Sequence, residues 1–154
     1  MEKVKRIIFF GIGAFLAIWI GWRVAGSPAV LINNWKLKQS VNSLKEGTSV
    51  FLNEVVPFRW DTLYTFGPYE SREEIAKKIG FQSPDIKENN VNEGMVHLLF
   101  VRDHSVEASV LGYGSNLGYM IDFTSKEDYK ITYDENARFT VNKKDGITEL
   151  SYIK

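Results

Sequence analysis

The sequence predicts an α+β protein: an N-terminal transmembrane helix, a stalk helix, and then one short helix packed on a mainly antiparallel, curved sheet. Three observations lead to this fold class. An uncharged apolar run fills residues 7–22, helix-spaced apolar residues follow, and strand-like segments separated by turns fill most of the chain after residue 94. The predicted parts are residues 1–26 as cytoplasmic tip and anchor, 27–47 as stalk helix and linker, and 48–154 as an extracytoplasmic domain.

The run Ile7–Trp22 contains 16 residues without a charged side chain. As a helix it would be about 24 Å long, slightly less than a bilayer's hydrocarbon core of about 30 Å. Basic residues precede it, namely Lys3, Lys5 and Arg6. The positive-inside rule then keeps the N-terminus in the cytoplasm and places the residues after Gly26 outside. We therefore expect a single-pass protein of the cell membrane, in contact with the lipid bilayer through Ile7–Trp22.

Two alternatives to this anchor remain open. A cleaved signal peptide also has a basic start and an apolar centre, and Val24-Ala25-Gly26 is an acceptable cleavage site. A buried core helix is the other alternative, although a run that is apolar on every face and follows basic residues favours a membrane segment over it. The chain contains no cysteine, which excludes lipoprotein processing.

The charge composition of residues 27–154 limits the functions that this exported part can have. Residues 27–154 carry 15 Lys and Arg against 18 Asp and Glu, a formal net charge of −3 with the two signs interspersed. No basic face for nucleic acid is indicated. The length fits one domain with a core sufficient to fold without disulfides, so residues 48–154 are predicted to fold on their own.

Two helices are predicted on either side of two strands. Ser27 and Pro28 resemble an N-cap and first helical position, and apolar residues then recur at helical spacing until Gly47. The strands are predicted at 49–56 and 60–66. The alternation in the second would place Trp60, Thr62, Tyr64 and Phe66 on one face. A short helix then begins after Ser71, with Glu74 as capping-box partner and Gly80 at its end.

The remainder is predicted as a loop at 82–93 followed by strands. Met95 to Arg102 is apolar on both faces, which indicates a central strand. Further strands are predicted at 106–113, 117–123, 129–133, 137–142 and 147–153, the last two joined as a hairpin.

No catalytic, cofactor or metal motif is indicated. The run Gly112–Gly118 has glycines at the wrong spacing for a dinucleotide loop and precedes a strand, so it is interpreted as a turn. His97 lies within an apolar strand and His104 in a turn, and without cysteine their spacing does not suggest zinc. We expect no cofactor, although a Ser-His-Asp arrangement is not refuted by sequence.

The segment Phe58–Tyr69 is aromatic at five of its twelve positions. It has two interpretations: a core face under the short helix, or a binding face, because exposed Trp, Tyr and Arg are common at interaction hot spots. The candidate binding surface comprises Arg59, Asp61, Tyr64 and Tyr69.

The same segment carries a resemblance. Trp60-Asp61, Tyr64, Phe66 and Pro68-Tyr69, followed by a short helix and later by Asn92-Glu93-Gly94-Met95, make residues 49–123 similar to a group of small exported proteins of Gram-positive bacteria. These carry a WDxxYxFxPY segment behind an N-terminal anchor. The resemblance implies an envelope address and one domain, and implies no activity.

These observations favour a membrane-tethered, non-enzymatic binding or accessory domain, such as an immunity-type or envelope-complex protein, with an extracytoplasmic protein partner. A small envelope hydrolase is one alternative. A regulator that contacts an integral membrane partner through its transmembrane helix is the other.

Overall fold

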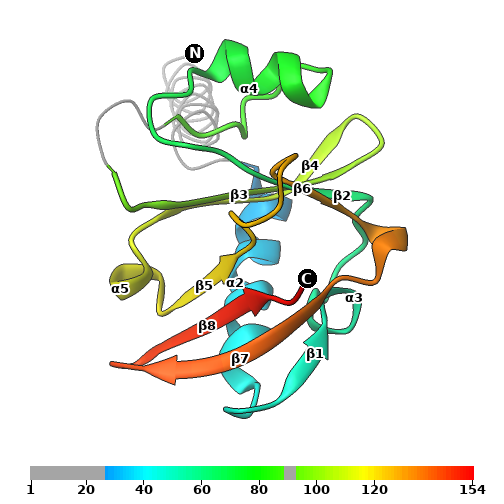
Figure 1. The fold of residues 1–154 in the computed structure, drawn as a ribbon. Helices are drawn as coiled ribbons and strands as arrows, with labels where there is room; N and C mark the ends of the chain where they lie inside the picture. Colours follow the sequence, from blue (N-terminus) through cyan, green and yellow to red (C-terminus); the bar gives the residue numbers. More distant parts are fainter. Residues whose placement is uncertain (1–26, 89–92) are drawn as a thin grey trace, which may run out of the picture.

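A computed structural model describes residues 27–88 and 93–154, and it places two four-stranded sheets face to face (Figure 1). The α+β class is confirmed, but the predicted single sheet is wrong. The β3 sheet has the order β4 (Ser105–Gly112), β3 (Val96–Arg102), β2 (Thr62–Thr65), β6 (Lys130–Thr132). The β7 sheet has the order β1 (Ser49–Phe51), β7 (Arg138–Lys144), β8 (Ile147–Tyr152), β5 (Tyr119–Asp122).

The sheets are mainly antiparallel, as predicted. β5 and β8 form the single parallel pair among the described strands, in the register Tyr119↔Thr148. β3 is an inner strand, and its residues from Val96 to Val101 are all buried, which confirms the central position predicted from its apolar faces. The β7–β8 hairpin is also confirmed. It turns at Asp145 and Gly146, whose φ values of 51° and 77° suit the left-handed turn that such short hairpins prefer.

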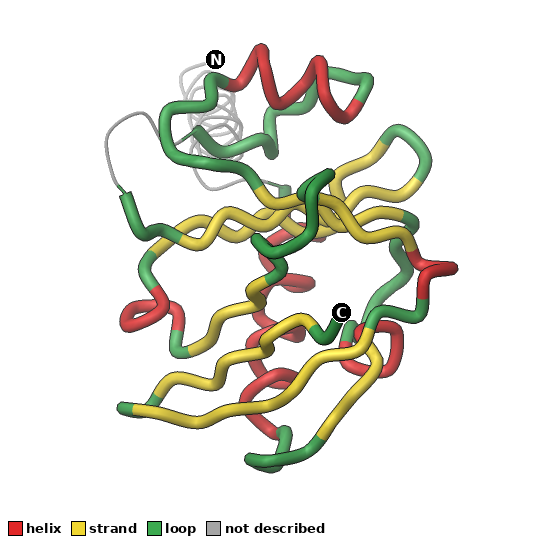
Figure 2. The backbone as a smooth tube through the Cα atoms, viewed as in Figure 1, coloured by secondary structure: helices red, strands yellow, loops and turns green. Residues whose placement is uncertain are grey.

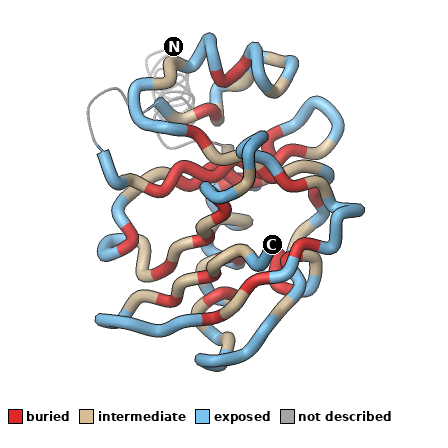
Figure 3. The backbone as a smooth tube through the Cα atoms, in the orientation of Figure 1, coloured by how far each residue is buried: buried red, intermediate tan, exposed pale blue. Residues whose placement is uncertain are grey.

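The main core lies between the two sheets (Figure 3). Its centre is formed by side chains that are fully inaccessible, including Leu63, Leu98, Phe100, Phe139 and Leu150. The antiparallel register pairs Leu63 with both Phe100 and Ile131, so the neighbouring strands β3, β2 and β6 present one continuous apolar face.

A second core covers the outer face of the β3 sheet, beneath α4 (Arg72–Ile79) (Figure 2). The predicted capping box is present: the Ser71 hydroxyl accepts from the Glu74 N–H, and the Glu74 carboxylate accepts from the Ser71 N–H. Gly80 ends the helix with a φ of 88°, as predicted. Ile75 packs against Leu99 and Phe66 in this layer, which explains why β3 is apolar on both faces.

Three sequence-based boundaries differ from the structure. The predicted strand 49–56 is β1 followed by the short helix α3 (Leu52–Val55). The predicted strand 60–66 contains only β2, so the alternation does not extend to Trp60. Trp60 belongs to the main core and Phe66 to the second core, on opposite sides of the sheet. The glycine-rich turn contains a four-residue helix, α5 (Gly114–Leu117), directly before β5.

The predicted stalk helix is part of the domain. α2 (Pro28–Ser43) has the predicted Ser27 cap, but Leu37 and Val41 lie in the main core with no exposed surface, and Val30 lies in the second core. The division between a stalk at 27–47 and a domain at 48–154 is therefore wrong, because one apolar face of α2 packs along the edge strand β4.

Asn34 fixes α2 to that edge. Its Nδ2 donates to the Ser109 carbonyl oxygen at 2.9 Å, and its Oδ1 accepts from the Ser109 N–H at 3.0 Å. The side-chain amide thus takes the place of a neighbouring strand. It supplies hydrogen-bond partners to the Ser109 N–H and carbonyl groups, which would otherwise have no partner at the edge of the sheet. Asn33 adds a bond from its Nδ2 to the Glu107 carbonyl oxygen at 2.9 Å.

Within 27–88 and 93–154, no helix has both the length and the hydropathy to cross a bilayer. The predicted anchor, Ile7–Trp22, lies outside the described residues.

Candidate functional site

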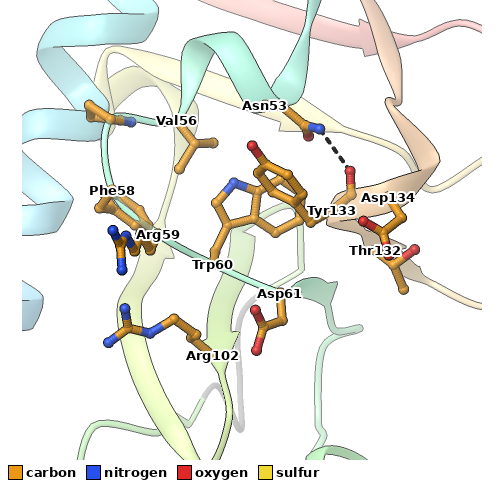
Figure 4. Close-up of a pocket in the computed structure, with 11 residues that line it drawn as sticks. Asn53, Val56, Phe58, Arg59, Trp60, Asp61, Arg102, Thr132, Tyr133 and Asp134 are labelled. Atoms are coloured by element: carbon orange, nitrogen blue, oxygen red, sulfur yellow. Dashed lines mark hydrogen bonds between the residues drawn. The ribbon is translucent and has the colours of Figure 1, made fainter.

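An open cavity of about 680 Å³ lies where the chain passes from α3 into β2, and we call it the Trp60 pocket (Figure 4). Its walls come from α3, the segment 56–61, the end of β3, and the turn after β6. The lining residues are Asn53, Val56, Pro57, Phe58, Arg59, Trp60, Asp61, Arg102, Thr132, Tyr133 and Asp134.

Aromatic rings form the floor of this pocket. Trp60 is only 3% exposed and makes edge contacts with Phe100, at a centroid distance of 5.8 Å, and with Tyr133, at 5.4 Å. Phe58 packs edge-on against Phe100 at 5.4 Å. Such contacts add to the stabilisation that comes from apolar burial. Trp60 therefore belongs to the main core, as one of the two interpretations expected, and also lines the pocket.

Two guanidinium groups lie on the same side of the Trp60 ring in Figure 4, those of Arg59 and Arg102. Arg59 is exposed and forms no ion pair within the described residues. Arg102 pairs with Glu107 at 3.1 Å, while its Nε is buried without a hydrogen-bond partner there. Arginine prefers carboxylate and phosphate partners, which accept its fork of donors. On this side of the pocket Arg59 is therefore open to an anionic group, whereas Arg102 already has Glu107 as a partner.

The carboxylates of Asp61 and Asp134 also line the pocket, away from the two guanidinium groups in the same view. Asp61 supports the fold as well, because its Oδ2 accepts from the Asp103 N–H at 2.8 Å. Asp103 holds a φ of 53° in the β3–β4 turn, so this bond supports a strained backbone position. One carboxylate oxygen of Asp61 is thus engaged within the fold.

Hydrogen bonds from Asn53 stabilise the pocket wall opposite the two arginines. Its Nδ2 donates to the Tyr133 carbonyl oxygen at 2.7 Å and to Asn136 Oδ1 at 2.9 Å. These bonds join α3 to the 3₁₀ turn Tyr133–Glu135. They hold the main chain at Tyr133, the residue whose ring makes the edge contact with Trp60.

The structure brings together only part of the predicted binding surface. Arg59 and Asp61 line the Trp60 pocket. Tyr64 instead stacks on Phe66, with ring centroids 6.1 Å apart, beside a smaller cavity of about 330 Å³ near α4. Tyr69 is 57% exposed in a turn, and its hydroxyl donates to Glu93 at 3.4 Å. The surface is split because β2 separates its residues onto different layers.

Sequence reasoning missed Arg102, Tyr133 and Asn53. Arg102 reaches the pocket through strand pairing, since β2 and β3 pair antiparallel with Thr62 opposite Val101. That register places the Arg102 backbone beside that of Asp61. The approach of Tyr133 to Trp60 depends in the same way on how β6 joins the other edge of β2, and no local pattern in the sequence marked either residue.

The two histidines lie apart from the pocket. His97 is 2% exposed in the β3 sheet, as predicted, and burial lowers its pKa to about 4, so it is neutral at physiological pH. His104 packs edge-on against Phe81 at 5.9 Å. In the part of the chain that the structure describes, no group of three or more histidine and acidic side chains is arranged to hold a metal ion.

Comparison with protein families, with curated proteins and with solved structures finds no match to this chain.

Proposed function

We propose that this chain is a membrane-tethered binding domain on the outer face of the cell membrane, and that the Trp60 pocket is its recognition site. The observation that carries the proposal is the pairing of Arg59 and Arg102 with an aromatic floor in an open cavity. Arginine and tryptophan are enriched at interaction hot spots. The proposed partner is an extracytoplasmic protein, as for an immunity-type protein or an envelope-complex subunit.

The chemistry of the pocket suggests what that partner presents. A carboxylate would face Arg59 and Arg102, and an adjacent apolar side chain would cover Phe58 and Tyr133. The acidic side, with Asp134, would repel a second anion and so fix the direction of the bound segment. We therefore propose a partner segment with an acidic residue next to an apolar one.

A hydrolase is less well supported by this geometry. None of the described residues that line the pocket is a histidine, serine or lysine. Asp61 is committed to the Asp103 N–H, and His97 is buried in the β3 sheet. General acid–base catalysis needs a titratable group within hydrogen-bond reach of the substrate. Asp134 and the Tyr133 hydroxyl would have to supply that group.

Photo-crosslinking in intact cells tests the recognition site. A benzophenone amino acid at Asp134, which is exposed on the pocket rim, is expected to give a discrete protein adduct, whereas the same group at Lys144 in the β7–β8 hairpin should not. Arg59→Glu should reduce the Asp134 adduct by roughly 10- to 100-fold, since hydrogen bonds to charged groups contribute about 1.5–3 kcal/mol.

Arg72→Glu is the matched control, because it makes the same charge reversal on the exposed start of α4. It should leave the Asp134 adduct unchanged. Equal loss with both variants would show that only net charge matters. Adducts that form solely from positions within residues 7–22 would favour the alternative, a regulator acting through its membrane segment.

A further inference from the structure

The outer face of α2 carries an apolar patch on its first two turns. Leu31, Ile32 and Trp35 are 43%, 53% and 61% exposed. Large apolar side chains gathered in one exposed patch mark a surface that contacts something other than water. We call these three residues the α2 patch.

Helical geometry shows that the patch is confined to half of the helix. At about 100° per residue, Val30, Leu37 and Val41 share the inner face, and the patch lies on the opposite side. Ile32 and Gln39 are seven residues apart and so occupy nearly the same angular position. The outer face therefore changes from apolar to polar after Trp35, while the inner face keeps apolar side chains at both ends, with Val30 on the first turn and Leu37 and Val41 further along.

The position of the patch in the chain indicates what covers it. α2 begins at Pro28 with its cap at Ser27, and residues 23–26 alone separate that cap from the apolar run ending at Trp22. Four residues span at most about 14 Å when fully extended. A chain inserted through residues 7–22 would therefore keep the start of α2 within about 14 Å of the hydrocarbon core, close enough to contact the headgroup layer.

We propose that the α2 patch lies in the headgroup region of the membrane and fixes the orientation of the domain on the bilayer; this inference rests on the proposed membrane tether. Trp35 suits that layer because the indole combines an apolar ring with a polar N–H. Lys36 lies beside the patch on an exposed position and would meet the lipid phosphates.

This orientation keeps the Trp60 pocket away from the bilayer. The pocket wall at Val56 follows α3, whose Val55 carbonyl oxygen accepts from the Ser40 hydroxyl near the far end of α2. Ser40 lies about 12 Å along the helix from Ile32 at 1.5 Å per residue. The patch would thus rest on the membrane while the pocket faces outward.

The test uses the full chain in vesicles of phosphatidylcholine and phosphatidylglycerol, with an environment-sensitive dye on single cysteines. The chain has no cysteine of its own, so each label is unique. Dye at Ile32→Cys or Trp35→Cys is expected to be quenched by spin-labelled lipid and shielded from aqueous iodide. Dye at Gln39→Cys, the matched control on the same face, should show the reverse.

Two results would overturn the inference. Iodide quenching at positions 32 and 35 equal to that at position 39 would place the patch in water. Shielding from iodide without lipid quenching would mean that protein covers the patch. That protein is a second copy of the chain if the shielding decreases when the protein is diluted in lipid. It is the chain's own residues 1–26 if the shielding does not change on dilution.

Flotation of the same vesicles keeps the two proposals separate. Protein that floats with lipid after carbonate treatment but lacks lipid quenching at 32 and 35 would leave the tether intact and refute the role of the patch. Protein that fails to float would refute the tether itself.

Discussion

A chain that begins at Thr48 is expected to lose cooperative folding, whereas a chain that begins at Ser27 should keep it. Residues 48–154 lack α2, and so lose Val30, Leu37 and Val41 from the two cores. Burial of such side chains contributes roughly 1.5–3 kcal/mol each. Their combined loss approaches the whole stability of a typical domain, about 5–15 kcal/mol.

The loss of α2 has a second consequence at the edge strand β4. The Ser109 N–H and carbonyl would lose Asn34, and Ala108 and Val110 would lose part of their cover. An uncovered edge of this kind promotes aggregation. Urea titration followed by far-UV circular dichroism measures both chains, with a single sharp transition expected for 27–154 alone.

Asn34→Ala in the 27–154 chain is the graded control. This change removes the two hydrogen bonds to Ser109 and leaves the apolar face of α2 in place. We therefore expect a folded protein that unfolds at a lower urea concentration. A sharp, reversible transition of the 48–154 chain would contradict the structure, because it would mean that α2 is dispensable to the core.

Replacement of Trp60 by alanine is expected to lower the free energy of unfolding by about 3–5 kcal/mol, the usual range for a buried large aromatic. Trp60 is 3% exposed and contacts Phe100 and Tyr133 edge-on. Its removal would leave a cavity, and the edge contact of Phe58 with the Phe100 ring at 5.4 Å opposes movement of that ring into the space.

Tyr69→Ala is the control for this variant, since Tyr69 lies in the same aromatic segment but is 57% exposed. Its effect should stay within about 0.5 kcal/mol, as for most surface substitutions. Urea midpoints with unchanged slopes give both values. A loss below about 1 kcal/mol for Trp60→Ala would show that the pocket floor is not part of the core.

Local signals in the sequence predicted much of the fold. The capping box at Ser71 and Glu74, the stop at Gly80 and the turn at Asp145-Gly146 all depend on neighbouring residues, and all are confirmed. The central place of β3 followed from its two apolar faces. Each of these features needs no knowledge of distant contacts.

The errors arose where distant contacts decide the structure. α2 was predicted as a stalk because its membrane-proximal position suggested a spacer, although Leu37 and Val41 already marked a buried face. The alternation through Trp60 failed because the chain before Thr62 is fixed by long-range bonds: the Asp61 N–H donates to the Val101 carbonyl oxygen, and the Asp61 carbonyl oxygen accepts from the Tyr133 N–H. No short-range pattern reveals such bonds.

The residues of the candidate site also divide into those that a local pattern identified and those that only distant contacts bring there. Arg59 and Asp61 were found because they flank an aromatic segment, and both line the pocket. Arg102 and Tyr133 reach it from 41 and 73 residues further along the chain than Asp61 and Trp60, respectively. Strand pairing alone brings them there, and pairing was not predicted in detail.

The location of the domain is the claim on which the proposed function depends, and thiol labelling in intact cells tests it most directly. Lys144→Cys is suitable because Lys144 is exposed at the end of β7, beside a turn whose own residues have positive φ. With no other cysteine in the chain, a membrane-impermeant maleimide should label it in intact cells. Glu2→Cys should label only after lysis, as expected for a cytoplasmic N-terminus. Labelling of Lys144→Cys only after lysis would contradict the account.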